Sequence, residues 1–132
     1  MAKRILALDD DPDILDIYSM AFGAEGYEVK TLLSPDNLAG AIVDFSPDLM
    51  LLDIKIGAFN GLEMCKVLKQ SSITRDIPIV IVSGLDCINR AVEEYAADAV
   101  ISKPFDLITL VNTVDRFLLA KVVPLGRVVL ED

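Results

Sequence analysis

Five short apolar runs recur along this chain at a steady interval. The runs are Ile5–Leu8, Tyr27–Leu33, Leu49–Leu52, Ile77–Val82 and Ala99–Ile101. Apolar runs without strict alternation of apolar and polar residues are typical of strands buried on both faces of a parallel sheet. A sheet of this kind needs an apolar layer on each side.

Helical spacing fills the stretches between the runs. The clear stripes are Ile14, Ile17, Tyr18, Ala21 and Phe22; Leu38, Ala41, Ile42 and Phe45; Ile88, Ala91, Val92, Tyr95 and Ala96; and Leu107, Leu110, Val111, Val114, Phe117 and Leu118. A weaker stripe runs from Leu62 to Leu68, and Ser34-Pro35 is a helix-start signal with Ser as N-cap. Five strands alternating with five helices predict a doubly wound α/β domain with helices on both faces.

The length of 132 residues fits one domain. We expect that domain to occupy residues 1–120 and a C-terminal tail to occupy 121–132. Pro124 and Gly126 interrupt the tail, and Val128–Leu130 is an apolar run. A stub, an extra strand and a packing arm all remain open for this segment.

Composition excludes several functions. The net charge of −9 argues against binding to nucleic acid or to an anionic membrane, since both would repel the chain. Histidine is absent, which excludes a Ser-His-Asp or Cys-His nucleophile and a Cys/His zinc site. The two cysteines, Cys65 and Cys87, lie at apolar helical spacings and are predicted to be buried thiols, which indicates a cytoplasmic protein.

Polar residues follow four of the five runs. They are Asp9-Asp10-Asp11 after the first, Asp53 after the third, Ser83-Gly84 after the fourth and Ser102-Lys103-Pro104 after the fifth. Sites in open α/β sheets form outside the carboxyl ends of the strands, so these groups should converge at one edge.

Clustered carboxylates repel one another and favour a hard cation such as Mg²⁺. A lysine beside them is well placed to meet an incoming anion. Together with a hydroxyl, these groups suggest phosphoryl transfer to an aspartate from an external donor. Simpler roles exist for some of them: Asp11 as a first-turn acid, Ser83 as a turn residue and Lys103 as an ion-pair partner.

The chain resembles the receiver domain of two-component response regulators over about residues 3–120. Four segments carry the resemblance: ILALDDDPDILDIY, LLDIKIGAFNGLEMCKVLK with Gly61 eight positions after the Asp, IVIVSG, and VISKPF. The resemblance implies a flavodoxin-like (βα)5 three-layer sandwich with parallel strand order 2-1-3-4-5. It also implies a cis Lys103–Pro104 bond, which the low cost of cis X-Pro permits.

The resemblance implies a role for each polar group at the edge. Asp53 would be the phosphoacceptor. Mg²⁺ would be held by Asp10 directly, by Asp9 through water, by Asp53 and by the backbone carbonyl of Lys55. Ser83 and Lys103 would contact the phosphoryl oxygens. The donor would be a sensor histidine kinase or a histidine phosphotransfer protein, and the domain could form a homodimer.

Three positions depart from the family pattern. Val100 stands where Tyr or Phe is usual, Gly57 where Pro is common, and Ala96-Ala97 where Gly-Ala is usual. These positions concern the output of the signal rather than the phosphorylation chemistry.

Two hypotheses concern the surroundings of the site. Lys55 and Leu85 would crowd the attacking water and slow loss of the phosphoryl group, unless both are solvated loop side chains. Leu15 and Phe105 would be exposed apolar residues that dock a kinase helix, unless they are the isolated apolar residues that any surface carries.

Two other functions are weighed against a phosphorylated switch. One is a haloacid-dehalogenase-type phosphatase, which LALDDD superficially resembles; turnover of a phosphomonoester would distinguish it. The other is a phosphate-independent interaction module. The intact acids, Ser83 and Lys103 argue against that module, and Val100 argues slightly for it.

Overall fold

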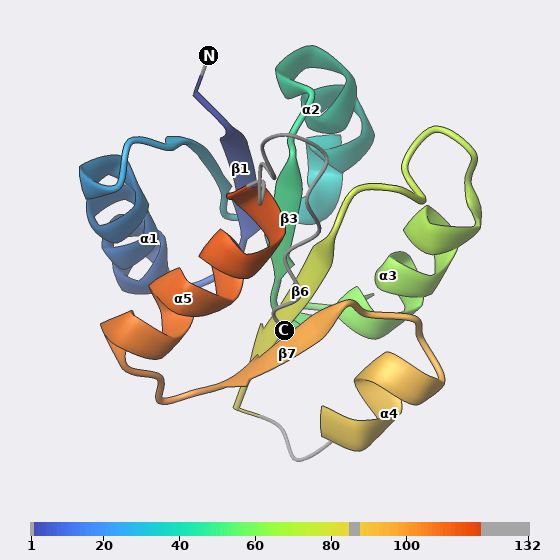
Figure 1. Ribbon diagram of the computed structural model, residues 1–132. Coiled ribbons are helices and arrows are strands. Elements are labelled where there is room, and N and C mark those ends of the chain that lie inside the picture. The colour runs from blue at the N-terminus through green and yellow to red at the C-terminus, as the bar shows by residue number, and fades with distance from the viewer. Residues whose placement is uncertain (1, 85–87, 120–132) are drawn as a thin grey trace, which may run out of the picture.

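The computed structural model describes residues 2–84 and 88–119, with the backbone alone for 88–90 (Figure 1). The predicted tail at 121–132, Leu85 and Cys87 lie outside the described residues. None of the described helices is long and apolar enough to cross a membrane.

A five-stranded parallel sheet forms the middle layer. Its strands are β1 (Arg4–Leu8), β2 (Glu28–Leu32), β3 (Leu49–Leu52), β6 (Ile79–Ser83) and β7 (Ala99–Ser102). The order β2-β1-β3-β6-β7 corresponds to 2-1-3-4-5 among the five apolar runs, so the predicted topology is confirmed. All of β3 and β6 and four of the five residues of β1 are buried, as expected for central strands covered on both faces.

Helices cover the two faces of the sheet (Figure 1). α1 (Pro12–Ala24) and α5 (Leu107–Leu118) lie on one face; the 3-10 turn η1 (Pro35–Asn37), α2 (Leu38–Phe45), α3 (Gly61–Gln70) and α4 (Ile88–Glu93) lie on the other. Each face has its own apolar core. Tyr18 and Leu110 belong to the α1/α5 core, and Ile42 and Cys65 to the opposite one. The predicted burial of the Cys65 thiol is confirmed.

The buried face of α1 differs from the predicted stripe. Leu15, Tyr18 and Phe22 are buried, whereas Ile14 and Ile17 are only half-buried. Leu15 is 4 % exposed and belongs to the α1/α5 core, so its predicted role as an exposed docking residue is wrong. The helix is apolar over a wide arc, and periodicity alone selected the wrong edge of that arc.

Two further elements differ from the sequence prediction. A two-stranded antiparallel hairpin, β4 (Lys55–Ile56) and β5 (Phe59–Asn60), follows the third strand of the sheet. The predicted fourth helix extends to Ala96, but α4 ends at Glu93, and Ala96 adopts a left-handed φ of 64°. The hairpin was not predicted because strands of two residues are too short to show a period. The helix was predicted too long because the apolar spacing continues to Ala96, whose backbone is not helical.

Candidate functional site

Three carboxylates meet at the carboxyl edge of the sheet. Asp9 follows β1, Asp10 is next in the chain, and Asp53 follows β3. One oxygen from each lies within 4.8 Å of the others. Asp9 is 1 % and Asp53 9 % exposed, whereas Asp10 is exposed to solvent. The site therefore has two buried acids and one facing the solvent, an oxygen-rich donor set suited to a hard cation.

Lys103 joins the two buried acids. Its Nζ donates to Asp9 Oδ2 at 2.8 Å and to Asp53 Oδ2 at 3.4 Å. The Lys103–Pro104 peptide bond is cis, as the resemblance implied. Lys103 thus forms the simpler ion pair that the sequence left open, with Asp9 and with Asp53. Its predicted contact with an incoming anion stays a prediction.

Ser83 lies next to Lys103 because β6 and β7 are neighbours. It is the last residue of β6, it is buried, and it pairs in register with Ser102 of β7. The backbone amide of Lys103 donates to the carbonyl oxygen of Ser83 at 2.9 Å. Pairing of the two strand ends therefore places the hydroxyl-bearing and ammonium-bearing residues side by side.

Burial and the neighbouring charges both shift the pKa values of Asp53 and Lys103. Burial raises the pKa of Asp53, and so does the charge of Asp9, while Lys103 and the amide of Ile54 lower it; the net direction is upward. Burial lowers the pKa of Lys103, but its hydrogen bonds to Asp9 and Asp53 and their charges raise it overall. The site thus holds closely spaced negative charge that a single ammonium compensates only in part.

Gly61 supports the backbone of Asp53. A Cβ at Gly61 would overlap the carbonyl oxygen of Asp53, so this position admits no side chain. The Gly61 amide donates to the Ile54 carbonyl at 2.6 Å, and Asn60 caps the start of α3 through its side chain. The β4–β5 hairpin thereby folds back onto Asp53, and it begins with Lys55. The predicted role of the Lys55 carbonyl as a metal ligand stays a prediction.

Tyr18 is a polar neighbour that the sequence analysis treated only as a core residue. It is 1 % exposed, and its hydroxyl has no hydrogen-bond partner in the described part of the chain. Its ring stacks on that of Phe105, with centroids 6.1 Å apart. Burial, followed by the charges of Asp9 and Asp53, raises the pKa of Tyr18. An apolar stripe in the sequence gives no signal of a buried, unpaired hydroxyl.

Comparison with known proteins identifies the family. The model of the response regulator receiver domain matches residues 5–115. The chain belongs to this family. The receiver domain is the phosphorylated part of two-component response regulators, so the signalling function inferred from the sequence is confirmed at the level of the family. The family match favours this function over the haloacid-dehalogenase-type phosphatase weighed as an alternative.

Relatives of this receiver domain are response regulators. It is 32 % identical to the transcriptional regulator RpaA of Synechocystis over 79 % of this chain and 44 % of that protein. It is 33 % identical to the phosphate regulon regulator PhoB of Pseudomonas aeruginosa over 80 % and 47 %. The chain thus matches less than half the length of these relatives.

Solved structures show the same fold. The response regulator TrrA of Thermotoga maritima, solved in complex with Mg²⁺-BeF, superimposes with a TM-score of 0.77 at 27 % identity. The match covers 88 % of this receiver domain and 99 % of TrrA.

Proposed function

We propose that this receiver domain accepts a phosphoryl group on Asp53. The observation that carries the proposal is the placement of Asp53 within reach of both Lys103 Nζ and the Asp9–Asp10 pair. In the reaction, an oxygen of the ionised Asp53 carboxylate forms a bond to phosphorus, and the bond from phosphorus to the donor nitrogen breaks. No base is needed, because the nucleophile already carries its charge.

Mg²⁺ is the cofactor proposed for this reaction. The three carboxylates fit it, since oxygen ligands from one or two acids with retained waters are its usual protein environment. Asp10 and Asp53 would hold the ion directly, Asp9 through water, and Lys55 through its backbone carbonyl. Bound Mg²⁺ would neutralise charge on the transferred group. TrrA, which shares this fold, was solved in complex with Mg²⁺-BeF, and this supports Mg²⁺ as the ion proposed here.

Lys103 and Ser83 complete the proposed site. Lys103 bridges Asp9 and Asp53 in this structure and would pair with the phosphoryl oxygens once Asp53 is modified. Ser83, at the end of the neighbouring strand, would donate its hydroxyl to the same group. Both contacts would stabilise the negative charge on the phosphoryl oxygens attached to Asp53.

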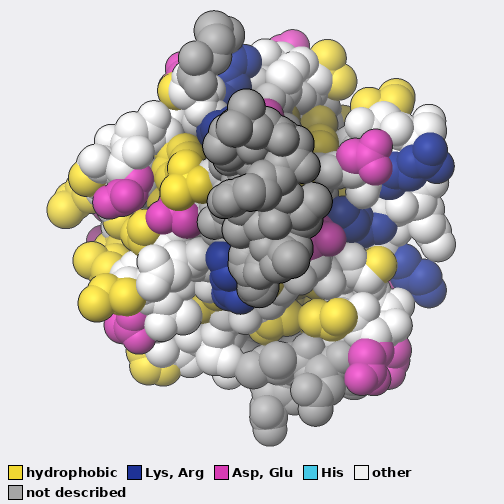
Figure 2. Space-filling model, viewed as in Figure 1, with side chains coloured by type: hydrophobic (Ala, Val, Ile, Leu, Met, Phe, Trp, Pro, Cys, Tyr) yellow, Lys and Arg dark blue, Asp and Glu magenta, His cyan; other side chains and the backbone are white. Residues whose placement is uncertain are grey.

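A histidine kinase or a histidine phosphotransfer protein is the proposed donor. Figure 2 shows hydrophobic side chains gathered over α1 and α5. Ile17, Met20 and Leu107 line a groove beside Phe105, with Met20 74 % exposed. These residues take the docking role first assigned to Leu15. Phe105 also lines the groove, but it is half-buried and stacked on Tyr18 instead of exposed as predicted. Such donors act in the cytoplasm, which is the compartment proposed for this chain.

The scope of the function is also proposed. Residues 1–120 would form the receiver unit, with 121–132 as a tail, and the phosphorylated domain would signal by protein contact, alone or as a homodimer. Slow loss of the phosphoryl group remains a hypothesis. Of the two residues behind it, Lys55 is exposed on the β4–β5 hairpin, and Leu85 lies outside the described residues.

Intact-mass measurement tests the proposal. The chain is incubated with Mg²⁺ and acetyl phosphate, alongside Asp53→Asn and the control Asp13→Asn, an exposed acid in the first turn of α1. One added phosphoryl group is expected for the wild type and for Asp13→Asn, and none for Asp53→Asn or after chelation of Mg²⁺. An adduct on Asp53→Asn would contradict the proposal. So would the absence of any adduct on the wild type with both acetyl phosphate and a phosphorylated histidine kinase.

A further inference from the structure

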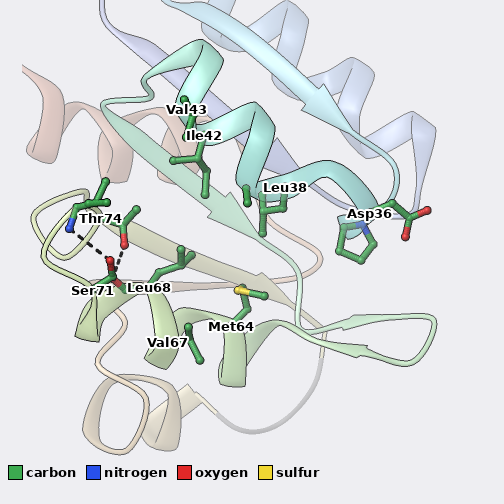
Figure 3. Close-up of a pocket in the computed structure, with 12 residues that line it drawn as sticks. Asp36, Leu38, Ile42, Val43, Met64, Val67, Leu68, Ser71 and Thr74 are labelled. Carbon is green, nitrogen blue, oxygen red and sulfur yellow. Dashed lines mark hydrogen bonds between the residues drawn. The ribbon is translucent and has the colours of Figure 1, made fainter.

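An apolar groove lies between α2 and α3, on the face of the sheet opposite α1 and α5. Its volume is about 460 Å³. Figure 3 shows Leu38, Ile42 and Val43 of α2 on one side and Met64, Val67 and Leu68 of α3 on the other. Asp36 is the only charged residue among the described residues that line it.

The rim of this groove is unusually apolar for a solvated surface. Val43 is 71 % exposed, Val67 57 % and Ile73 82 %. Single exposed apolar residues are ordinary, but three large ones around one apolar hollow mark a surface that another segment covers.

The chain itself supplies a suitable segment. Thirteen residues follow Leu119, and the stretch from Lys121 to Asp132 reads KVVPLGRVVLED. It carries two apolar runs, Val122–Val123 and Val128–Leu130, with Arg127 between them. An apolar stretch of this length gains free energy by leaving water.

The topology of the fold places the start of this segment near one end of the groove, the end formed by Ser71 and Thr74. α5 runs back along the sheet as the other helices do, so Leu119 lies at the edge where the strands begin. The groove reaches the same edge at Ser71 and Thr74, just beyond the end of α3, while Asp36 lies at the far end (Figure 3). Arg127 lies eight Cα–Cα steps beyond Leu119, and extended chain of that length spans about 26 Å, so the apolar run that begins at Val128 can enter the groove at its Ser71–Thr74 end.

We propose that residues 121–132 dock in the α2/α3 groove and cover its apolar rim. The other apolar groove, between α1 and α5, borders Phe105 and the phosphorylation site. A resident tail there would block the face to which the proposed function assigns the phosphodonor. The proposed function assigns no partner to the α2/α3 groove, so a tail bound there would not block the phosphodonor. The docking does not depend on the phosphorylation chemistry, so either proposal can fail alone.

Coupling between groove and tail substitutions tests the docking in the full chain. Ile73→Gln alters the groove, and Val128→Gln with Val129→Gln alters the tail. The matched control is Ile108→Gln, an equally apolar residue on the α1/α5 face that is 74 % exposed. All of these changes are neutral in charge. Thermal unfolding is recorded for each variant and for the combinations, at two protein concentrations.

The expected result is non-additivity between groove and tail. Loss of a small apolar contact should lower the unfolding temperature by about 5 °C in either variant, with little further loss when both are combined. Ile108→Gln should change little and add independently to the tail variant. Coupling of the tail to Ile108 instead of Ile73 would place it on the other face and overturn the proposal.

Two more results would also overturn the docking proposal. Additive effects of Ile73→Gln and the tail variant would show that the groove and the tail do not meet. A concentration-dependent unfolding temperature that Ile73→Gln abolishes and the tail variant leaves intact would assign the groove to a second copy of the chain.

Discussion

Gly61 shows how a residue without a side chain can determine the shape of a site. Its Cα approaches the Asp53 backbone so closely that a Cβ would overlap the carbonyl oxygen. The obstacle is backbone and cannot rotate away. This glycine therefore fixes where the loop after β3 returns toward α3, and with it the position of the proposed phosphoacceptor.

Gly61→Ala is expected to destabilise the fold by about 3 kcal/mol, because the new methyl group must displace the Asp53 backbone. Urea denaturation measures the change. Gly23→Ala is the matched control: a methyl group at Gly23, in α1, would meet no atom within 4 Å, and alanine there should add up to about 1 kcal/mol of stability. Equal effects of the two substitutions would contradict the close approach.

Tyr18 is expected to respond to substitution in the opposite way from most core residues. Its buried hydroxyl lacks a hydrogen-bond partner among the described residues, and such a group costs about 1–3 kcal/mol. Tyr18→Phe keeps the ring and its stacking on Phe105, so we expect stability to rise by about 1 kcal/mol. Urea denaturation at neutral pH is the measurement. A loss of stability would show that the hydroxyl has a partner in solution.

At the scale of elements, the segment after α4 contains backbone strain. Ala96 has a φ of 64°, a conformation that costs an alanine about 1 kcal/mol and a glycine almost nothing. The resemblance places glycine at this position in the family. The left-handed residue turns the chain so that the Ala97 amide bonds to the Ala91 carbonyl at 3.0 Å before β7 begins.

Ala96→Gly is therefore expected to stabilise the fold by about 0.5–1 kcal/mol, against the usual cost of a glycine. Ala97→Gly is the control, since Ala97 is buried, has an ordinary φ and should lose stability through a small cavity. Thermal unfolding of both variants distinguishes local strain from a general effect of glycine. A destabilised Ala96→Gly would refute the strain.

The sequence predicted elements best where burial on both faces left a continuous apolar run. β3 was predicted with its observed ends, and Asp9, Asp10, Asp53, Ser83 and Lys103 were placed at one edge because parallel strands end together. Prediction failed where two faces of a helix are both apolar. α1 borders both the core and the α1/α5 groove, so it is apolar on two faces. Periodicity cannot tell which of two apolar faces is buried, and the prediction therefore placed Leu15 on the surface.

Other features depend on contacts that no local pattern encodes. The β4–β5 hairpin and the close approach of Gly61 to Asp53 arise from the return of the loop to α3. That the Tyr18 hydroxyl finds no partner among the described residues depends on how the side chains around it pack. These are properties of packing, and they become visible only in three dimensions.

At the scale of the whole molecule, the negative charge should make stability sensitive to Mg²⁺. The chain carries a net charge of −9, and three of its acids share one edge of the sheet. An ion that binds only the folded chain stabilises it by RT ln(1 + [L]/Kd), about 2.7 kcal/mol at a hundred times Kd. We therefore expect the unfolding temperature to rise with Mg²⁺ and to fall when the ion is chelated.

Two controls separate site binding from screening of the net charge. NaCl at equal ionic strength should raise the unfolding temperature much less than MgCl₂ does. Asp10→Asn should remove most of the Mg²⁺ effect, whereas Asp13→Asn, outside the cluster, should keep it. An equal rise with Mg²⁺ in the wild type and in Asp10→Asn would contradict binding at this site.

The parallel sheet gives the domain two poles. Asp9, Asp53 and Lys103 lie at the pole where strands end, and α5 brings the chain out at the pole where strands begin. Sequence that follows α5 therefore starts nearly a full strand length away from the Asp53 carboxylate. A segment attached at that point can therefore change in length or composition without contacting the three acids.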